Sequence, residues 1–281
     1  MFSLSLRFQL FIITAVCLLF ILAGTQPLPY IIGLLAIMTA MTSVKSRGFV
    51  MSFSPFFLLL LGYFSLKMMA DDFSFADVTV TEIIRLEKTL FFGYIPSALL
   101  QQAIPSGVRS VVVAICDALY LSHFVVPVIV GIILWHVRRD MFKRYMTGLV
   151  VLSYAGFLLF VLFPVAPPWW ATYYGYLSGD EAVPLISRVP VDVMISSPNP
   201  VAAMPSLHAA YSMYVAVSVV LVWGRAKRWV FLYPLAVAFA VVYLGHHYVV
   251  DVLAGWGMVG IVDKSMYFCK IRIWEFTKRG K

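Results

Sequence analysis

Residues 145–163 have the sequence YMTGLVVLSYAGFLLFVLF, in which no residue carries a charge. Residues 206–223, with the sequence SLHAAYSMYVAVSVVLVW, form a second run without Asp, Glu, Lys or Arg. An α-helix needs about 20 predominantly apolar residues to cross the hydrocarbon core of a bilayer. Each of these two runs therefore predicts one membrane-spanning helix.

The composition of the whole chain fits this prediction and excludes other classes of protein. Of the 281 residues, 62% are hydrophobic and 12% are charged, whereas about 25% are charged in a typical soluble domain. The three cysteines have no CxxC spacing, so we predict neither a disulfide framework nor a zinc site. The formal net charge is +8, but the basic residues lie in short clusters between apolar runs. That pattern marks the cytoplasmic side of a membrane protein and does not indicate a nucleic-acid partner.

The same length criterion applied along the chain predicts an all-α fold, a polytopic membrane helix bundle with eight spans. Asp263 and Lys264 interrupt the inner end of the last span, where we expect snorkelling or mutual pairing to accommodate them. The predicted spans are residues 8–24, 28–44, 49–69, 109–136, 145–163, 206–223, 229–246 and 248–268.

The distribution of basic residues predicts the orientation of these spans. If the N-terminus lies in the cytoplasm, the cytoplasmic segments hold 16 of the 21 Lys and Arg residues, and most acidic residues lie outside. Cytoplasmic loops of membrane proteins carry such an excess of Lys and Arg. We therefore predict an integral membrane protein embedded in a bilayer, with both termini in the cytoplasm.

Two segments predicted on the outer side are too long to be simple loops. Residues 71–106 begin with acidic residues and continue with spaced apolar ones, which predicts an amphipathic helix at the interface or a short re-entrant element. Residues 164–205 are rich in Pro, Gly and aromatic residues and are expected to form a cap over the membrane. The residues expected to form an aromatic belt at the outer interface are Trp169, Trp170, Tyr173, Tyr174 and Tyr176.

Two histidines lie where predicted spans begin at the outer face. Pro205 and Ser206 favour a helix start, which places His208 in a first helical turn, where free backbone amides bind anions. His247 and Asp251 are four residues apart and would share one face of a helix. Although 39 residues separate the two histidines, the predicted topology puts them at a similar depth.

These residue types suit nucleophilic catalysis. A carboxylate bonded to one ring nitrogen of His247 fixes the tautomer and leaves the other nitrogen free to attack. A second histidine, His208, can protonate a leaving alkoxide. A single histidine at an interface is more often a packed or water-facing residue, but ionisable residues inside spans are costly and by default functional. His208, His247 and Asp251 together therefore predict an active site on the extracytoplasmic face.

The same residues resemble motifs of the type-2 phosphatidic acid phosphatase superfamily, which contains lipid phosphatases and phosphotransferases. The shared motifs are Pro205-Ser206-x-His208 and His247-x-x-x-Asp251. Within that superfamily, the inositol phosphorylceramide synthase-like branch is the more similar. The segments that carry this similarity are Phe163-Pro164-Val165-Ala166-Pro167-Pro168-Trp169, Pro205-Ser206-Leu207-His208, Tyr243-Leu244-x-His246-His247-Tyr248-x-x-Asp251 and Glu87-Lys88-x-Leu90-Phe91-Phe92-Gly93.

The resemblance implies a domain division. A six-helix catalytic domain of the phosphatase type would occupy residues 49–281 and would include the cap segments 71–106 and 164–205. Two additional N-terminal spans would precede it in residues 1–48.

The resemblance also implies a mechanism. The residue that matches His247 attacks phosphorus to form a phosphohistidine, the one that matches His208 is the acid and base, and the one that matches Asp251 orients the nucleophile. The partners implied are lipid substrates, and no cofactor is required.

Two departures from the superfamily pattern bear on the reaction. The phosphatases usually carry a Lys…Arg-Pro motif before the cap, where this chain has residues 163–168. They also usually carry Ser-Arg shortly before the nucleophile, where this chain has Ala240 and Val241. Such cations hold the dianion of a phosphate monoester, whereas a phosphodiester has one negative charge and needs fewer charged contacts. The losses favour a lipid phosphotransferase that passes a phospho-head group to an alcohol.

Other assignments stay open at the level of sequence. If Arg109, Arg188 or Lys88 replaces the missing cations, a lipid phosphate phosphatase that uses water as the acceptor is the alternative. A transporter or structural membrane protein without enzymatic activity and a metal-dependent hydrolase are further rivals. Asp117 and His123 lie on roughly opposed sides of the fourth span, where bonds to neighbouring helices explain them as well as contact with a lipid head group does. The residues we consider for contact with the substrate are Ser206, His246, Arg109, Arg188, Asp117 and His123.

Overall fold

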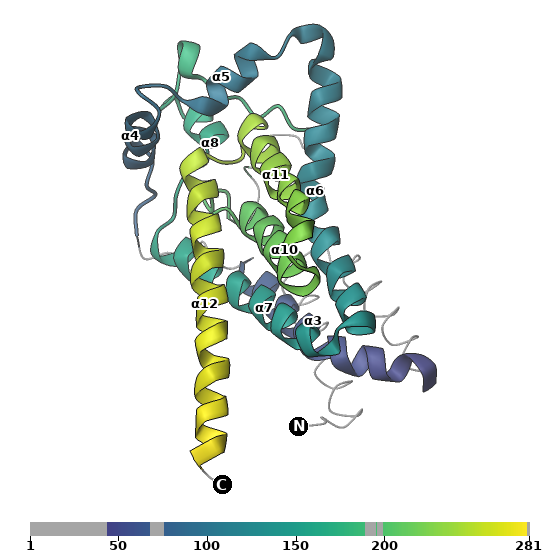
Figure 1. Ribbon diagram of the computed structural model, residues 1–281. Helices are drawn as coiled ribbons and strands as arrows, with labels where there is room; N and C mark the ends of the chain where they lie inside the picture. The colour runs from purple at the N-terminus through teal and green to yellow at the C-terminus, as the bar shows by residue number, and fades with distance from the viewer. Residues whose placement is uncertain (1–43, 68–75, 189–194, 196–198, 280–281) are drawn as a thin grey trace. The chain divides into compact units, whose positions relative to one another are not determined.

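The computed structural model describes residues 44–67, 76–188, 195 and 199–279 (Figure 1). The predicted spans at residues 8–24 and 28–44 therefore lie outside the described residues, except for residue 44. The chain falls into two compact units that divide between residues 68 and 69, and each unit is described by itself. The division predicted between residues 48 and 49 stays a prediction.

The described part of the first unit is one helix, α3 (Val44–Lys67), which corresponds to the predicted span at residues 49–69. It contains Pro55, and its most apolar stretch covers residues 48–60. The rings of Phe49 and Phe53, one turn apart, pack at a centroid distance of 4.3 Å.

The second unit is a bundle of long helices that follow the predicted spans closely. Three stretches of the described residues are long and apolar enough to cross a membrane: residues 106–137, 139–162 and 225–243. The helices are α6 (Ser106–Val137), α7 (Arg139–Leu162), α10 (Leu207–Trp223), the 3₁₀ helix η3 (Arg225–Phe231), α11 (Leu232–Tyr243) and α12 (Val249–Arg279). The structure thus confirms an all-α membrane helix bundle, and α12 extends beyond the predicted end at residue 268.

Helix α10 lies at the centre of the second unit, where it packs against α6, α7, α11 and α12. Small residues make this close packing feasible. A Cβ atom added to Gly156 of α7 would lie 2.7 Å from the Leu207 side chain, and one added to Gly148 would collide with the ring of Tyr214. Because α10 is enclosed on several sides, its first turn lies inside the protein.

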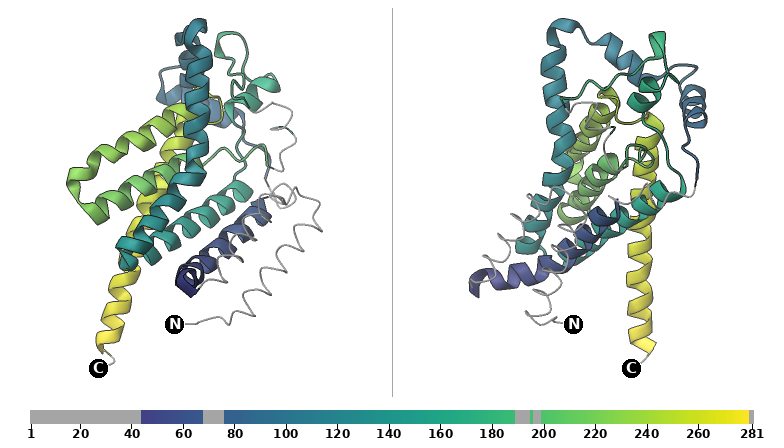
Figure 2. Two further views of the ribbon diagram at one scale, coloured as in Figure 1. Left: turned by 90° about the vertical axis from the view of Figure 1, so that its right-hand side faces the viewer. Right: turned by 180° about the vertical axis from the view of Figure 1, so that it is seen from behind.

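The described parts of the two predicted cap segments form one layer at the end of the bundle where α12 begins (Figures 1 and 2). Lys88 Nζ lies 2.6 Å from Glu181 Oε1, and Gln102 donates a hydrogen bond of 2.6 Å to the carbonyl of Asp180. Parallel bridges join Thr79 to Val165 and Val165 to Ala202. The helical elements of the layer are α4 (Thr81–Leu90), α5 (Pro96–Ala103), α8 (Pro168–Tyr173) and the 3₁₀ turn η2 (Gly179–Glu181).

The aromatic residues of the cap divide into two groups. The tyrosines at positions 173, 174 and 176 are exposed, as expected of a belt. Trp169 is only 2% exposed, and its backbone N–H donates to the carbonyl of Gly245 at 3.1 Å. The prediction that Trp169 belongs to an interfacial belt was therefore wrong. The short helix α8 buries this side chain, and its backbone bonds to the connection between α11 and α12.

Candidate active site

The structure brings His208 and His247 into direct contact. His208 lies in the first turn of α10, and His247 lies in the connection between α11 and α12. Nδ1 of His208 is 3.0 Å from Nε2 of His247, and the two ring centroids are 5.1 Å apart. Because one nitrogen of each ring faces the other ring, the pair can share or pass a proton.

Asp251 completes a line of three side chains. Its Oδ2 atom lies 3.4 Å from Nδ1 of His247, and both side chains are buried. A carboxylate beside Nδ1 favours the tautomer that carries hydrogen on Nδ1, which leaves the lone pair on Nε2. The distance is that of an ion pair and is long for a hydrogen bond, and catalytic hydrogen bonds commonly tighten once substrate is bound.

The prediction that His247 and Asp251 share a helix face was wrong in one respect. Helix α12 begins at Val249, so His247 precedes the helix and Asp251 lies in its first turn. The Oδ2 atom of Asp251 accepts the backbone N–H of Tyr248 at 2.8 Å. When the side chain of the third helical residue accepts the backbone N–H of the residue before the helix, it caps the helix and fixes where the helix begins. This contact turns the chain so that His247 can approach Asp251 from outside the helix.

Backbone contacts hold the starts of α10 and α12 together. The N–H of Ser206 donates to the carbonyl of Asp251 at 2.9 Å. The hydroxyl of Ser206 caps α10 by accepting the N–H of Ala209 at 3.3 Å. A Cβ atom added to Gly255 would collide with the carbonyl oxygen of Ser206, so only glycine permits this approach. Ser206, which we considered for contact with the substrate, is fully buried and makes these contacts within the protein.

Two further histidines and a tyrosine surround the pair. The Tyr120 ring lies 4.4 Å from the ring of His208 and 4.6 Å from that of His246, measured between centroids. The ring of His123 lies 4.2 Å from that of His208, and its Nδ1 contacts the carbonyl of Tyr120. Nε2 of His246 is buried, and no hydrogen-bond partner for it lies among the described residues. A buried nitrogen without a partner costs about 1–3 kcal/mol, which a ligand can relieve.

The other three residues considered for substrate contact make their described bonds elsewhere. Arg109 donates to the carbonyls of Gln101 and Ile104, at 3.2 and 3.3 Å, where α5 ends. Asp117 accepts the Ser187 hydroxyl at 2.8 Å and the backbone N–H of Arg188 at 3.2 Å. Arg109 therefore stabilises α5, and Asp117 fixes the loop that contains Arg188.

Glu87, which is not among the predicted site residues, approaches the site from α4. Its carboxylate accepts the backbone N–H groups of Val249 and Val250, at 2.9 and 3.1 Å. Burial raises the pKa of Glu87 to about 7, although these two hydrogen bonds lower it, and the neighbouring Asp251 raises it further. A buried residue of this kind is invisible in apolar periodicity, and the only signal for it was the motif at residues 87–93.

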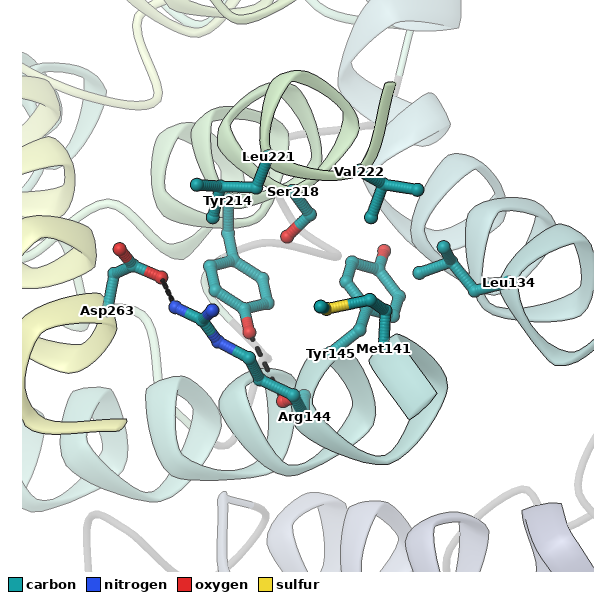
Figure 3. A pocket seen from close by; sticks show the side chains of 9 residues that line it. All are labelled: Leu134, Met141, Arg144, Tyr145, Tyr214, Ser218, Leu221, Val222 and Asp263. Atoms are coloured by element: carbon teal, nitrogen blue, oxygen red, sulfur yellow. Dashed lines mark hydrogen bonds and ion pairs between the residues drawn. The ribbon is translucent and has the colours of Figure 1, made fainter. Parts of the chain in front are cut away.

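A small cavity lies away from the histidines, near the other end of α10 (Figure 3). Its volume of about 20 Å³ leaves room for about one water molecule. Beside it, Nη2 of Arg144 lies 2.6 Å from Oδ1 of Asp263. The expected pairing of Asp263 with Lys264 was therefore wrong, because Arg144 on α7 is the partner of Asp263. The lining residues are Leu134, Met141, Arg144, Tyr145, Tyr214, Ser218, Leu221, Val222 and Asp263.

Comparison with known proteins supports a specific family. The chain matches the model of the PAP2 superfamily over residues 81–263. It is 24% identical over 263 residues to the phosphoinositol dihydroceramide synthase of Bacteroides thetaiotaomicron. The matched region covers 87% of this chain and 83% of that protein. It is 30% identical over 112 residues to the inositol phosphorylceramide synthase catalytic subunit of Schizosaccharomyces pombe. That matched region covers 36% of this chain and 26% of the yeast protein. No solved structure matches significantly.

Proposed function

This chain belongs to the PAP2 superfamily, and from that premise we propose that it is a lipid phosphotransferase that works through a phosphohistidine. The family and its relatives make it an integral membrane enzyme that acts on lipid phosphate. The observation that carries the finer proposal is the line of His208, His247 and Asp251, with separations of 3.0 and 3.4 Å, in which His247 and Asp251 are buried.

The first half-reaction transfers the phospho-head group to His247. The lone pair on Nε2 forms a bond to phosphorus, and the bond from phosphorus to the lipid oxygen breaks. The proton that the departing alkoxide needs comes from His208. Asp251 stabilises the charge on the His247 ring through Nδ1–H. Because Nε2 of His247 faces His208 in the free protein, the substrate phosphate must displace this contact when it binds.

The second half-reaction returns the site to its starting state. An alcohol gives its proton to His208 while its oxygen bonds to phosphorus. The bond from phosphorus to Nε2 then breaks, and the electron pair returns to His247. Because His247 must be neutral and His208 protonated in the first step, we expect a plot of kcat against pH with two limbs.

Two of the three cations that could replace the missing ones are bonded within the protein, which supports a phosphodiester donor over a phosphate monoester. Lys88 pairs with Glu181, and Arg109 donates to the carbonyls at the end of α5. Ala240 and Val241, at the positions where the superfamily's phosphatases have Ser-Arg, are fully buried in α11. A phosphodiester carries one negative charge, so a site with few cations suits it better than it suits a dianion. His246, with its unpartnered Nε2, is our first candidate for contact with the phosphate.

The relatives suggest which donor and acceptor to examine first. One is named a phosphoinositol dihydroceramide synthase and the other an inositol phosphorylceramide synthase. We propose phosphoinositol as the head group and a ceramide-type alcohol as the acceptor. From the distribution of basic residues, we place the site on the extracytoplasmic face and both termini in the cytoplasm. A lipid phosphate phosphatase, in which water resolves the phosphohistidine, is the alternative function.

A single panel of reactions separates these functions. The protein in mild detergent is incubated with head-group-labelled phospholipids and with lipid phosphates, each with and without a long-chain alcohol or ceramide. His247→Ala tests the nucleophile, and His136→Ala, which removes an exposed histidine at the end of α6, is the matched control. Transfer of a labelled head group to the alcohol that only His247→Ala abolishes supports the phosphotransferase. Release of inorganic phosphate from monoesters, regardless of alcohol, contradicts it and establishes the phosphatase.

A further inference from the structure

The carboxyl group of Glu87 lies between the cap and the start of the helix that carries Asp251. The side chain is 0% exposed, and each oxygen accepts one backbone N–H, from Val249 at 2.9 Å and from Val250 at 3.1 Å. A fully buried carboxyl group is costly unless it is paired or well bonded. Its presence here, bonded to a helix end 162 residues away along the chain, therefore calls for a role.

The start of α12 shows what Glu87 contributes. The first N–H groups of a helix have no partner within the helix. At α12, Asp251 accepts the N–H of Tyr248, and Glu87 accepts the next two, from Val249 and Val250. Two carboxyl groups thus divide the N–H groups of one helix start between them.

This division leaves Asp251 available to His247. Without Glu87, the N–H groups of Val249 and Val250 would be unpaired donors close to the Asp251 carboxylate. They would compete with Nδ1–H of His247 for its oxygens. With Glu87 in place, Oδ1 of Asp251 has no hydrogen-bond partner among the described residues, and Oδ2 stays 3.4 Å from Nδ1.

Glu87 is itself fixed, because several contacts hold α4 in the cap. Ile83 and Ile84 on the same helix are buried in an apolar cluster that includes Tyr248 and Val250. The neighbouring Lys88 bonds to Glu181, and the segment before α4 bonds to the cap through Thr79, whose N–H donates to Pro164 at 2.8 Å. A carboxyl group on such a rigid support can set the position of a helix start.

We propose that Glu87 is a positioning residue for the histidine site: by binding the first two N–H groups of α12, it holds Asp251 against Nδ1 of His247. The inference rests on the proposed phosphotransferase function, in which Asp251 sets the tautomer of His247. Both carboxyl oxygens of Glu87 bond to the backbone of α12, so we expect its effect to reach the reaction through Asp251.

The kinetic test compares Glu87→Gln and Glu87→Ala with Glu82→Gln, which changes an exposed acid on the same helix. Rates are divided by the amount of folded, monodisperse protein. We expect kcat to fall about tenfold in Glu87→Gln and about 100-fold in Glu87→Ala, with KM unchanged, because small displacements of catalytic groups cost rates of this size. Glu82→Gln should retain the wild-type kcat. Wild-type kcat in Glu87→Gln, or an effect confined to KM, overturns the proposal.

A double-mutant cycle asks whether Glu87 acts through Asp251. If it does, adding Glu87→Gln to an Asp251→Asn protein should lower kcat by less than about twofold, since coupled residues are not additive. If the two losses multiply in full, Glu87 acts independently of Asp251 and the proposal fails.

A spectroscopic measurement keeps this test separate from the proposed function. In protein labelled with ¹⁵N-histidine, the His247 signal, identified by its loss in His247→Ala, should report hydrogen on Nδ1. Glu87→Gln should shift His247 toward a mixture of tautomers, and Glu82→Gln should not. If the wild type transfers no head group but this shift occurs, the phosphotransferase proposal fails and the positioning role stands. An unchanged tautomer in Glu87→Gln overturns the positioning role whatever the activity.

Discussion

Two pairs of ionisable residues, each with one aspartate on α12, differ in how completely their hydrogen-bonding groups are satisfied. Asp251 and Asp263 are 12 residues apart, which is about 18 Å along a helix. Asp263 bonds to Arg144 at 2.6 Å, and both side chains keep more than a quarter of their surface exposed. Asp251 lies 3.4 Å from His247 in a nearly dry environment, and buried atoms of His246, His247 and Asp251 have no hydrogen-bond partner among the described residues.

The difference separates a structural pair from the pair that we propose is reactive. A short Arg–Asp pair at the edge of the bundle satisfies its charges and joins two helices, α7 and α12. The histidine site instead retains unmet hydrogen-bonding capacity in a place that water does not fill freely. Most proteins avoid such groups, and where they persist they commonly have a catalytic role. An aspartate in the apolar helix α12 therefore belongs to a structural ion pair at position 263 and to the proposed active site at position 251.

Removal of the nucleophile should have the largest effect. His247→Ala should lower head-group transfer by about 10³-fold or more, because loss of the attacking group leaves only binding and orientation. Its thermal unfolding temperature in detergent should stay within a few degrees of the wild type. The measurement is transfer of a labelled head group by the His247→Ala and His136→Ala proteins. Equal residual activity in both proteins would contradict the assignment of His247.

Replacement of the orienting carboxylate should have the next largest effect. Asp251→Asn keeps the shape but offers an amide N–H to Nδ1, which favours hydrogen on Nε2 and removes the attacking lone pair. We expect kcat to fall by about 10³-fold, and by at most about 10⁴-fold as in other histidine–aspartate sites. Asp263→Asn provides the matched control on the same helix. A similar loss of kcat in both variants would remove the distinction between the two pairs.

The buried carboxyl of Glu87 should make stability fall as pH rises. Its pKa is raised from 4.5 to about 7 in the folded protein, so the folded state binds a proton more tightly than the unfolded state. The stabilisation is complete below about pH 4.5 and is lost by the time the pH passes about 7, a change of at most about 3 kcal/mol. Thermal unfolding at a series of pH values checks this. Glu87→Gln should flatten the slope and Asp263→Asn should keep it; a slope retained in Glu87→Gln would assign it to another group.

Loss of the structural pair should have the smallest effect. Asp263→Asn removes the charge that Arg144 faces, and because both groups are partly exposed the cost should be about 1–2 kcal/mol. We expect an unfolding temperature lower by a few degrees and a kcat per folded molecule within about twofold of the wild type. A large loss of kcat without loss of stability would show that this end of the bundle takes part in the reaction.

The sequence predicted the features that depend on local pattern. Spans such as residues 145–163 are defined by length and hydropathy alone, and α7 (Arg139–Leu162) follows that prediction closely. The proximity of His208 and His247 followed from counting spans, because two helix starts on the same side of a membrane lie at a similar depth. The structure brings these two residues together at 3.0 Å.

Features that depend on partners far apart in the chain escaped prediction. Arg144 is 119 residues from Asp263, and Glu87 is 162 residues from Val249, so no local pattern connects them. Trp169 was misplaced because an aromatic residue near an interface has the same sequence signature whether it faces lipid or the protein. The start of α12 was misplaced by one residue, because the hydrogen bond from the N–H of Tyr248 to Asp251 makes the helix begin at Val249.

The most direct test is to trap the covalent intermediate. A phospholipid labelled on phosphorus is mixed with the protein in the absence of acceptor, and the reaction is stopped in alkali, where phosphohistidine survives. We predict that the label, with its head group, is recovered on His247 by mass spectrometry, that Asp251→Asn carries far less of it, and that adding the alcohol removes it. Turnover of the same lipid with no label on His247 would contradict the phosphohistidine mechanism.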